Sequence, residues 1–283
     1  MLMKKVLIAT DFSPAADRLL NCIDELKEMG LEEAVIVHVI DIRLGEESSP
    51  SLQMSNDKKL KDITDRLEAH SINCKVYTPL GFAATEIVQI AKIEEVSIIL
   101  IGSRGRSVIK EIFIGSTTFD VIRLSDVPVL IEKYKKDKEN QLINVCINKF
   151  EKILLPIDFS NCSSFIINEI LESSLLIKEI ILLSVVEEGE SKKELDIKKA
   201  QYREKLQEFA EGFEKKGISA KTEVLHGIPS KAITKTAEKE LVTSIIMGTR
   251  GRGLIKSLLL GSTSDAVART ATRPVILIPC NKK

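Results

Sequence analysis

The chain has 283 residues, of which 44% are hydrophobic and 29% are charged, a composition typical of a soluble globular protein with room for two domains. Lys plus Arg and Asp plus Glu each number 41, so the formal net charge is zero. This balance argues against broad binding to nucleic acid or to membrane surfaces. No run of residues approaches the length of a membrane span and no secretion signal is apparent, so we expect a cytoplasmic protein.

The two halves of the chain contain the same predicted elements in the same order. In the first half, apolar runs predict strands at 6–10, 35–40, 74–78, 96–101 and 129–131. Helices are predicted after Asp11-Phe12-Ser13, over 57–69, after Gly81 and from Ser116. Ser13 is a suitable N-cap because Pro14 follows it at the first helical position.

In the second half, strands are predicted at 153–157, 180–186, 220–225, 242–247 and 275–278. The helices are predicted after Asp158-Phe159-Ser160, over 192–216, after Gly227 and from Ser262. The helix over 192–216 has an apolar face, as a packing helix requires, made of Leu195, Tyr202, Leu206, Phe209 and Phe213.

Apolar strands that alternate with helices predict an α/β fold with a parallel sheet covered on both faces. Right-handed crossovers then produce two tandem doubly wound domains, each a Rossmann-like half with strand order 3-2-1-4-5. We place the domains at 1–134 and 151–283, with a charge-rich linker at 135–150. The last strand of each domain is apolar and has a free edge. Pairing of these two edges would make an internal pseudo-dimer, and burial under a neighbouring loop is the alternative.

A glycine motif follows the fourth predicted strand of each half. It consists of Gly102, Gly105 and Gly115-Ser116-Thr117, and it recurs 146 residues later as Gly248, Gly251 and Gly261-Ser262-Thr263. Glycines let the backbone approach a ligand closely, and the free N–H groups of the following helix favour an anion. A purely structural turn is the alternative, but the repetition of strand, loop and helix favours a phosphate site.

Charged residues flank this motif in both halves. Arg104 and Arg250 lie inside the loops, where they either neutralise a phosphate partly or are solvated surface charges. Asp11 and Asp158 end the first strands, at the predicted crevice where the sheet reverses its winding. There a carboxylate can accept hydrogen bonds from ribose hydroxyls or hold a hydrated Mg²⁺, unless it only caps the next helix. No P-loop, dinucleotide fingerprint or general base is evident, so no catalytic residue is assigned.

These residues resemble the universal stress protein family in its tandem form. The glycine spacing, the Asp-Phe-Ser segments and the proline before each last strand all match that family's pattern. The resemblance implies that each domain binds ATP or AMP/ADP, with the glycine loop and the Ser-Thr pair on the phosphates. It further implies that eight residues border the adenosine or line the same pocket. They are Ala9, Thr10, Val39, Ile101, Pro156, Ile157, Val185 and Met247. The family also dimerises through its last strand, which agrees with the edge pairing above.

Three functions remain open from the sequence. The first is a stress-response regulator that binds ATP or AMP without turnover, one nucleotide per domain. The second is a slow Mg²⁺-dependent ATP hydrolase, and the third is a nucleotide-free interaction scaffold. A homodimer of whole chains and an unidentified protein partner are compatible with each of them.

The cysteines are odd in number and scattered, at positions 22, 74, 146, 162 and 280, and no two form a C-x-x-C pair. In a cytosolic protein this spacing favours reduced thiols over disulfides or zinc ligands. The three histidines, at positions 38, 70 and 226, are equally dispersed, so a metal centre built from these residues is not expected.

Overall fold

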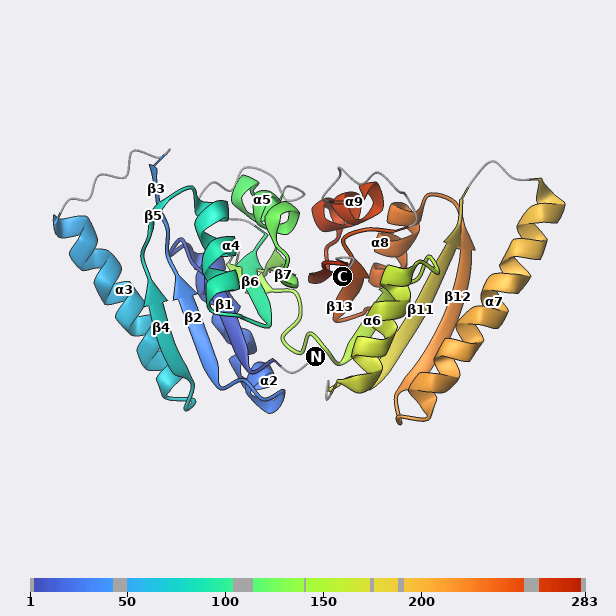
Figure 1. Ribbon diagram of the computed structural model, residues 1–283, viewed down its shortest axis with the longest axis horizontal. Helices are drawn as coiled ribbons and strands as arrows, with labels where there is room; N and C mark the ends of the chain where they lie inside the picture. The colour runs from blue at the N-terminus through green and yellow to red at the C-terminus, as the bar shows by residue number, and fades with distance from the viewer. Residues whose placement is uncertain are drawn as a thin grey trace. The chain divides into compact units, whose positions relative to one another are not determined.

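The computed structural model describes residues 3–42, 50–103, 114–139, 141–173, 176–187, 191–251 and 260–280. The chain separates into two compact units, and the division falls between Asn144 and Val145. Each unit has its own sheet and its own helices (Figure 1). Among the described residues, no helix is long and apolar enough to cross a membrane.

The first domain contains a five-stranded parallel sheet in the order β7-β6-β1-β2-β4. Its strands are β1 (Lys5–Ala9), β2 (Glu33–Val37), β4 (Asn73–Tyr77), β6 (Ile98–Gly102) and β7 (Val129–Glu132). Two very short strands, β3 (Ile40–Asp41) and β5 (Leu80–Gly81), pair with each other as a separate small sheet. The observed strand order is therefore the predicted one, 3-2-1-4-5.

The helices of the first domain follow its strands in turn. They are α1 (Pro14–Asp17), a 3₁₀ turn (Arg18–Cys22), α2 (Ile23–Glu28), α3 (Pro50–Glu68), α4 (Ala83–Ile93) and α5 (Ser116–Leu124). Ser13 is the N-cap of α1, since its hydroxyl accepts a hydrogen bond from the Ala16 amide at 3.2 Å. This cap and the proline at the first helical position confirm the predicted helix start after Asp11-Phe12-Ser13.

The second domain repeats this topology in the order β12-β11-β10-β13-β14, again all parallel. Its strands are β10 (Lys152–Pro156), β11 (Glu179–Val186), β12 (Ser219–His226), β13 (Ser244–Gly248) and β14 (Val275–Ile278). Its helices are α6 (Asn161–Glu172), α7 (Lys192–Glu214), α8 (Pro229–Lys239) and α9 (Ser262–Thr270). Each predicted strand and helix of this half is present.

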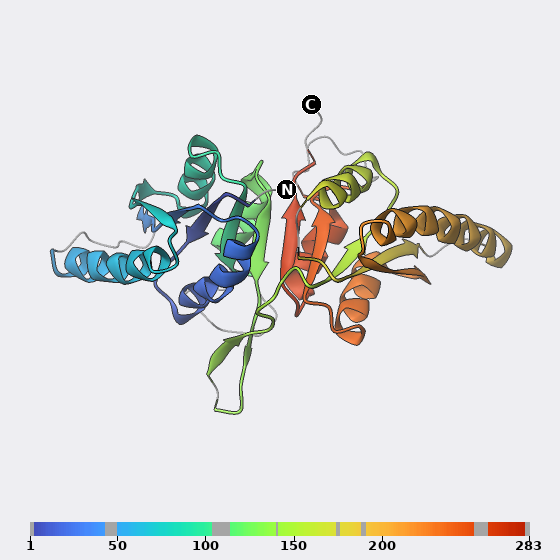
Figure 2. The ribbon, with the colours of Figure 1, turned by 90° about the horizontal axis from the view of Figure 1, so that it is seen from below.

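Helices cover both faces of the second sheet, as a parallel sheet requires. Helices α6 and α7 pack together on one face, and α8 and α9 pack together on the other (Figure 2). On α7, the side chains of Leu206, Ala210 and Phe213 are buried, which confirms the predicted apolar face of this helix. Most residues of β10, β11 and β13 are buried, as is every residue of β14, whereas the edge strand β12 is partly exposed.

The predicted linker contains a β-hairpin. Strands β8 (Tyr134–Lys136) and β9 (Leu142–Asn144) pair antiparallel, and the hairpin stands out from the rest of the first domain (Figure 2). At its turn, the Asp137 carboxylate accepts hydrogen bonds from two backbone amides at 2.9 Å each. The charged sequence shows no alternation of apolar residues, so pattern alone did not predict these strands. The mutual pairing of the last strands, β7 and β14, stays a prediction.

The expectation of reduced thiols is wrong for two of the five cysteines. Cys162 and Cys280 form a disulfide, with their Cα atoms 5.5 Å apart, whereas Cys22, Cys74 and Cys146 are not disulfide-bonded. The two partners are separated by 118 residues, so their spacing in the chain gives no sign of the pair. The fold brings them together because the start of α6 and the chain beyond β14 lie on either side of β13.

Candidate functional site

The candidate site lies at the carboxyl ends of β10 and β13, where the winding of the second sheet changes direction. These strands are neighbours, but α6 follows β10 on one face and α9 follows β13 on the other. Such a switch point leaves a crevice outside the strand ends. A cavity of about 480 Å³ occupies this crevice.

All of the second-domain residues that the sequence assigned to a nucleotide line this one cavity. They are Pro156, Ile157, Asp158, Val185, Met247, Gly248, Arg250, Gly251, Gly261, Ser262 and Thr263. The sequence analysis missed other lining residues, namely Cys162, Ser163, Leu183, Ser184, Glu187, Tyr202, Pro229, Ile233 and Ser264. Of these, Tyr202 could have been noticed in the sequence, because it belongs to the predicted apolar face of α7.

At two positions of the loop, neighbouring atoms leave no room for a side chain. A Cβ atom on Gly248 would overlap the Cys162 sulfur, and a Cβ on Gly251 would overlap the Asp158 Oδ2 atom. At Gly261 a Cβ would lie 3.3 Å from both the Ser264 hydroxyl and the Thr249 carbonyl oxygen, which is a tight fit. The loop therefore passes so close to its neighbours that only glycine fits without a local shift.

The helix that follows the loop begins with unshared amides. Gly261 is the N-cap of α9, with φ −73° and ψ 150°, and it has no side chain to accept a bond from the first turn. Its own amide donates to the Thr249 carbonyl at 2.7 Å, and the Ser264 hydroxyl donates to the same oxygen at 2.8 Å. These bonds hold the loop against α9 and leave the helix start facing the cavity, where its dipole favours an anion.

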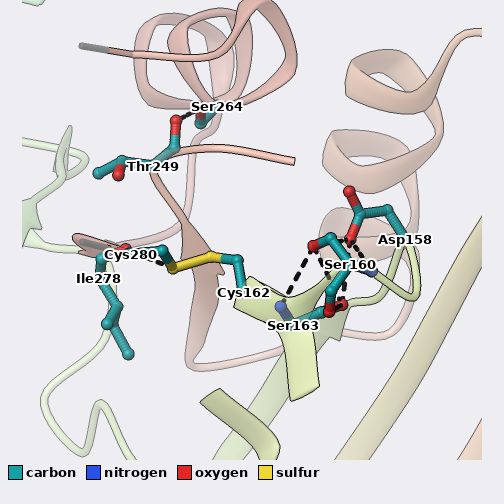
Figure 3. Close-up of a disulfide and its surroundings, with 8 residues drawn as sticks. All are labelled: Asp158, Ser160, Cys162, Ser163, Thr249, Ser264, Ile278 and Cys280. Carbon is teal, nitrogen blue, oxygen red and sulfur yellow. Dashed lines mark hydrogen bonds between the residues drawn. A yellow bond between two sulfur atoms is a disulfide. The ribbon is translucent and has the colours of Figure 1, made fainter. Parts of the chain in front are cut away.

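Asp158 has two different oxygens. Oδ1 accepts hydrogen bonds from the Ser160 amide at 3.0 Å, the Ser160 hydroxyl at 2.6 Å and the Ser163 hydroxyl at 3.0 Å (Figure 3). Oδ2 instead faces Gly251 in the glycine loop. Ser160, not Asp158, is the N-cap of α6, so Oδ1 orders the turn that leads into the helix, and Oδ2 lies beside the cavity.

The first domain has the same arrangement where the structure describes it. The Asp11 Oδ1 atom accepts from the Ser13 amide at 3.0 Å, as Asp158 does from Ser160. Gly115 is the N-cap of α5, and its amide donates to the Ser103 carbonyl at 2.8 Å. The helix continues with Ser116 and Thr117.

The remaining assigned residues of the first domain come from three strand ends. Ala9 ends β1 and Thr10 follows it, both buried; Val39 follows β2; Ile101 and Gly102 end β6. Arg104 and Gly105 lie outside the described residues. Across the described parts of both domains, no three His, Cys, Asp or Glu side chains are grouped to hold a metal ion.

Comparison with known proteins identifies the domain type. The model of the universal stress protein family matches residues 3–133 and again residues 149–279. Universal stress protein MJ0577 of Methanocaldococcus jannaschii is 34% identical over 158 residues, covering 48% of this chain and 98% of that protein. Universal stress protein MJ0531 of the same organism is 29% identical, covering 51% of this chain and 91% of that protein.

Solved structures show the same tandem architecture. A universal stress protein from Archaeoglobus fulgidus superposes with a TM-score of 0.71 at 27% identity, covering 98% of this chain and 97% of that one. The Pseudomonas aeruginosa protein PA1789 has a TM-score of 0.70 at 17% identity over 98% of this chain and 92% of that one, a likeness of fold alone. The chain therefore belongs to the universal stress protein family and carries two copies of its domain in tandem.

Proposed function

We propose that each domain binds one adenine nucleotide, ATP, ADP or AMP, and that the protein acts in stress response as a nucleotide-dependent regulator. The observation that carries the proposal is the single cavity in the second domain that gathers the glycine loop, the start of α9 and Asp158. Its volume of about 480 Å³ lies within the range of small-molecule sites, roughly 300–1,000 Å³.

The lining supports this ligand chemistry in three parts. Val185, Ile233 and Met247 supply apolar surface for a base. Arg250 and the amides at the start of α9 supply positive charge for phosphates. Asp158 is positioned to accept hydrogen bonds from ribose hydroxyls, or to meet a hydrated Mg²⁺ that arrives with the nucleotide.

The proposal is tested on the purified full-length chain. Mass spectrometry of the gently denatured protein should release an adenine nucleotide, and calorimetry of nucleotide-free protein should detect binding of ATP, ADP or AMP. Mg²⁺ is added in a second titration, because its contribution depends on the nucleotide's phosphates.

A single glycine substitution makes the test specific. Gly251→Ala should weaken binding at the second site about tenfold or more, because its Cβ displaces Asp158 Oδ2 or the loop. Gly212→Ala on α7 is the matched control, since a Cβ there lies 3.7 Å from the nearest atom, Leu171 Cδ1. If no adenine nucleotide co-purifies and none binds the wild-type protein, the proposal is wrong. Release of phosphate from ATP above the buffer rate would instead indicate turnover.

A further inference from the structure

The disulfide of the second domain is part of the wall of its cavity. Cys162 is the second residue of α6 and lines the cavity, and Cys280 follows β14. Both residues are of intermediate exposure, and neither is fully buried. Figure 3 shows Cys162 between Cys280 and the turn that contains Asp158 and its serine partners.

Both sulfur atoms pack against the first glycine of the loop. A Cβ on Gly248 would overlap the Cys162 sulfur and would lie 3.3 Å from the Cys280 sulfur. Two bonded sulfurs are about 2.05 Å apart, and two thiols cannot approach each other that closely. Reduction therefore forces at least one sulfur to move at the point where β13 enters the glycine loop.

Reduction to a thiolate would also add negative charge where an anion is proposed to bind. The start of a helix favours the thiolate form of a cysteine, and Cys162 lies in the first turn of α6. A thiolate at Cys162 would put a negative charge into the cavity that is proposed to hold phosphates. The disulfide, in contrast, is neutral.

The first domain lacks this pair. At the positions that correspond in the repeat, Ala15 replaces Cys162 and Tyr134 replaces Cys280. Tyr134 is buried, and burial raises the pKa of its phenol well above the usual value, so it stays neutral. The first site therefore serves as an internal control without this disulfide.

We propose that Cys162–Cys280 is a thiol-exchange site that sets the nucleotide affinity of the second domain, high when oxidised and low when reduced. The inference rests on the proposed nucleotide function. In the first step, the thiolate of a low-molecular-weight thiol attacks the Cys280 sulfur, and Cys162 leaves as a thiolate at the helix start. A second thiol then attacks the mixed disulfide, which frees Cys280 and yields the disulfide of the reductant. The protein gains two electrons and one proton, which Cys280 takes up; the two thiols lose two electrons and two protons, and the second proton goes to solvent while Cys162 stays a thiolate.

The test compares oxidised and dithiothreitol-reduced full-length protein, with ATP and AMP as probes in calorimetry. Oxidised protein should bind two nucleotides per chain. After reduction, one site should keep its affinity and the other should weaken about tenfold. Cys280→Ser should show the weak second site under both conditions, and Cys74→Ser, whose thiol lies on β4 of the first domain, should behave as the wild type.

Two results would overturn the inference alone. One is equal affinity of oxidised and reduced wild-type protein at both sites. The other is a count of five reactive thiols in the denatured, unreduced chain, where the disulfide predicts three. Absence of nucleotide binding in both redox forms would instead overturn the proposed function, and this inference with it.

Discussion

At the scale of the residue, the turn after the first strand of each domain has an unusual backbone. Phe12 and Phe159 both have φ 58°, the left-handed region that costs a residue with a side chain roughly 1–2 kcal/mol. Aromatic contacts hold them there: the Phe159 ring centroid lies 4.7 Å from that of Tyr202, and Phe12 lies 4.1 Å from His38. Each strained residue directly follows a site aspartate and precedes the serine whose amide donates to that aspartate's Oδ1.

A second residue-scale feature is an ion-pair cluster centred on Glu94. Its carboxylate accepts hydrogen bonds from Lys5, Lys75 and Tyr77, of which the Lys75 bond is 2.8 Å long. The Lys5, Lys75 and Tyr77 hydrogen bonds, in that order, lower the pKa of Glu94 to about 2. The second domain repeats the arrangement, with Glu240 2.8 Å from Lys221.

We predict that Glu94→Gln makes the protein's stability less dependent on pH. The folded pKa of Glu94 is about 2, below the unfolded value of about 4.3, so its contribution is present above about pH 4.3. That contribution is lost as the pH falls towards 2. Urea unfolding should therefore show wild type more stable than Glu94→Gln at pH 6, with the gap closing between pH 5 and pH 2. Glu95→Gln, an exposed neighbour, is the control; a gap that stays constant with pH would contradict the prediction.

At the scale of the element, the helices after the glycine loops begin without a capping side chain. Gly115 has φ −64° and ψ 149°, a conformation open to any residue, and a Cβ there meets only ordinary contacts at 3.7 and 3.8 Å. Neither backbone strain nor space therefore requires a glycine at this position. Its lack of a side chain keeps the first amides of α5 available to a ligand.

We predict that Gly115→Asp stabilises the free protein and abolishes nucleotide binding in the first domain. An aspartate N-cap accepts hydrogen bonds from the first turn and complements the dipole, a gain of about 0.5–1 kcal/mol. The same carboxylate occupies the phosphate position and repels it. The midpoint temperature of thermal unfolding should rise by about 2–4 °C. The stoichiometry of nucleotide binding in calorimetry should fall by one per chain.

Gly115→Ala is the matched control for this change. It adds a Cβ that fits but no hydrogen-bond acceptor. The first domain of this variant should therefore still bind nucleotide. A Gly115→Asp protein that is stabilised yet still binds nucleotide in both domains would show that α5 does not contact the ligand.

At the scale of the whole molecule, two domains of one topology carry sites that are not identical. The strand end is Ala9-Thr10 in the first domain and Pro156-Ile157 in the second, and only the second domain contains the disulfide. Each domain has its own switch point, between β1 and β6 in the first and between β10 and β13 in the second.

We predict that the intact chain binds two nucleotides and that each site changes separately. Gly115→Asp should reduce the stoichiometry of ATP binding to about one per chain, and Gly251→Ala should leave one site unchanged and the other about tenfold weaker or more. The double variant should keep only the weakened site, with its circular dichroism spectrum unchanged. If either single variant abolished both sites, the two domains would have to bind as one unit.

The sequence by itself determined the main strands and helices, the doubly wound topology, and the glycine-loop and strand-end residues of the second cavity. These depend on local patterns: apolar runs, helix caps, and a glycine motif repeated at one offset. Such patterns also place strand ends at one edge of a parallel sheet, which is why Asp158 and Gly248 were expected together.

Only the tertiary structure decided the Cys162–Cys280 bond, the place of Tyr202 in the cavity and the division of Asp158 between a turn and the glycine loop. Each of these depends on contact between segments far apart in the chain. The distance between such segments is set by how helices pack on the sheet, and no local propensity encodes it.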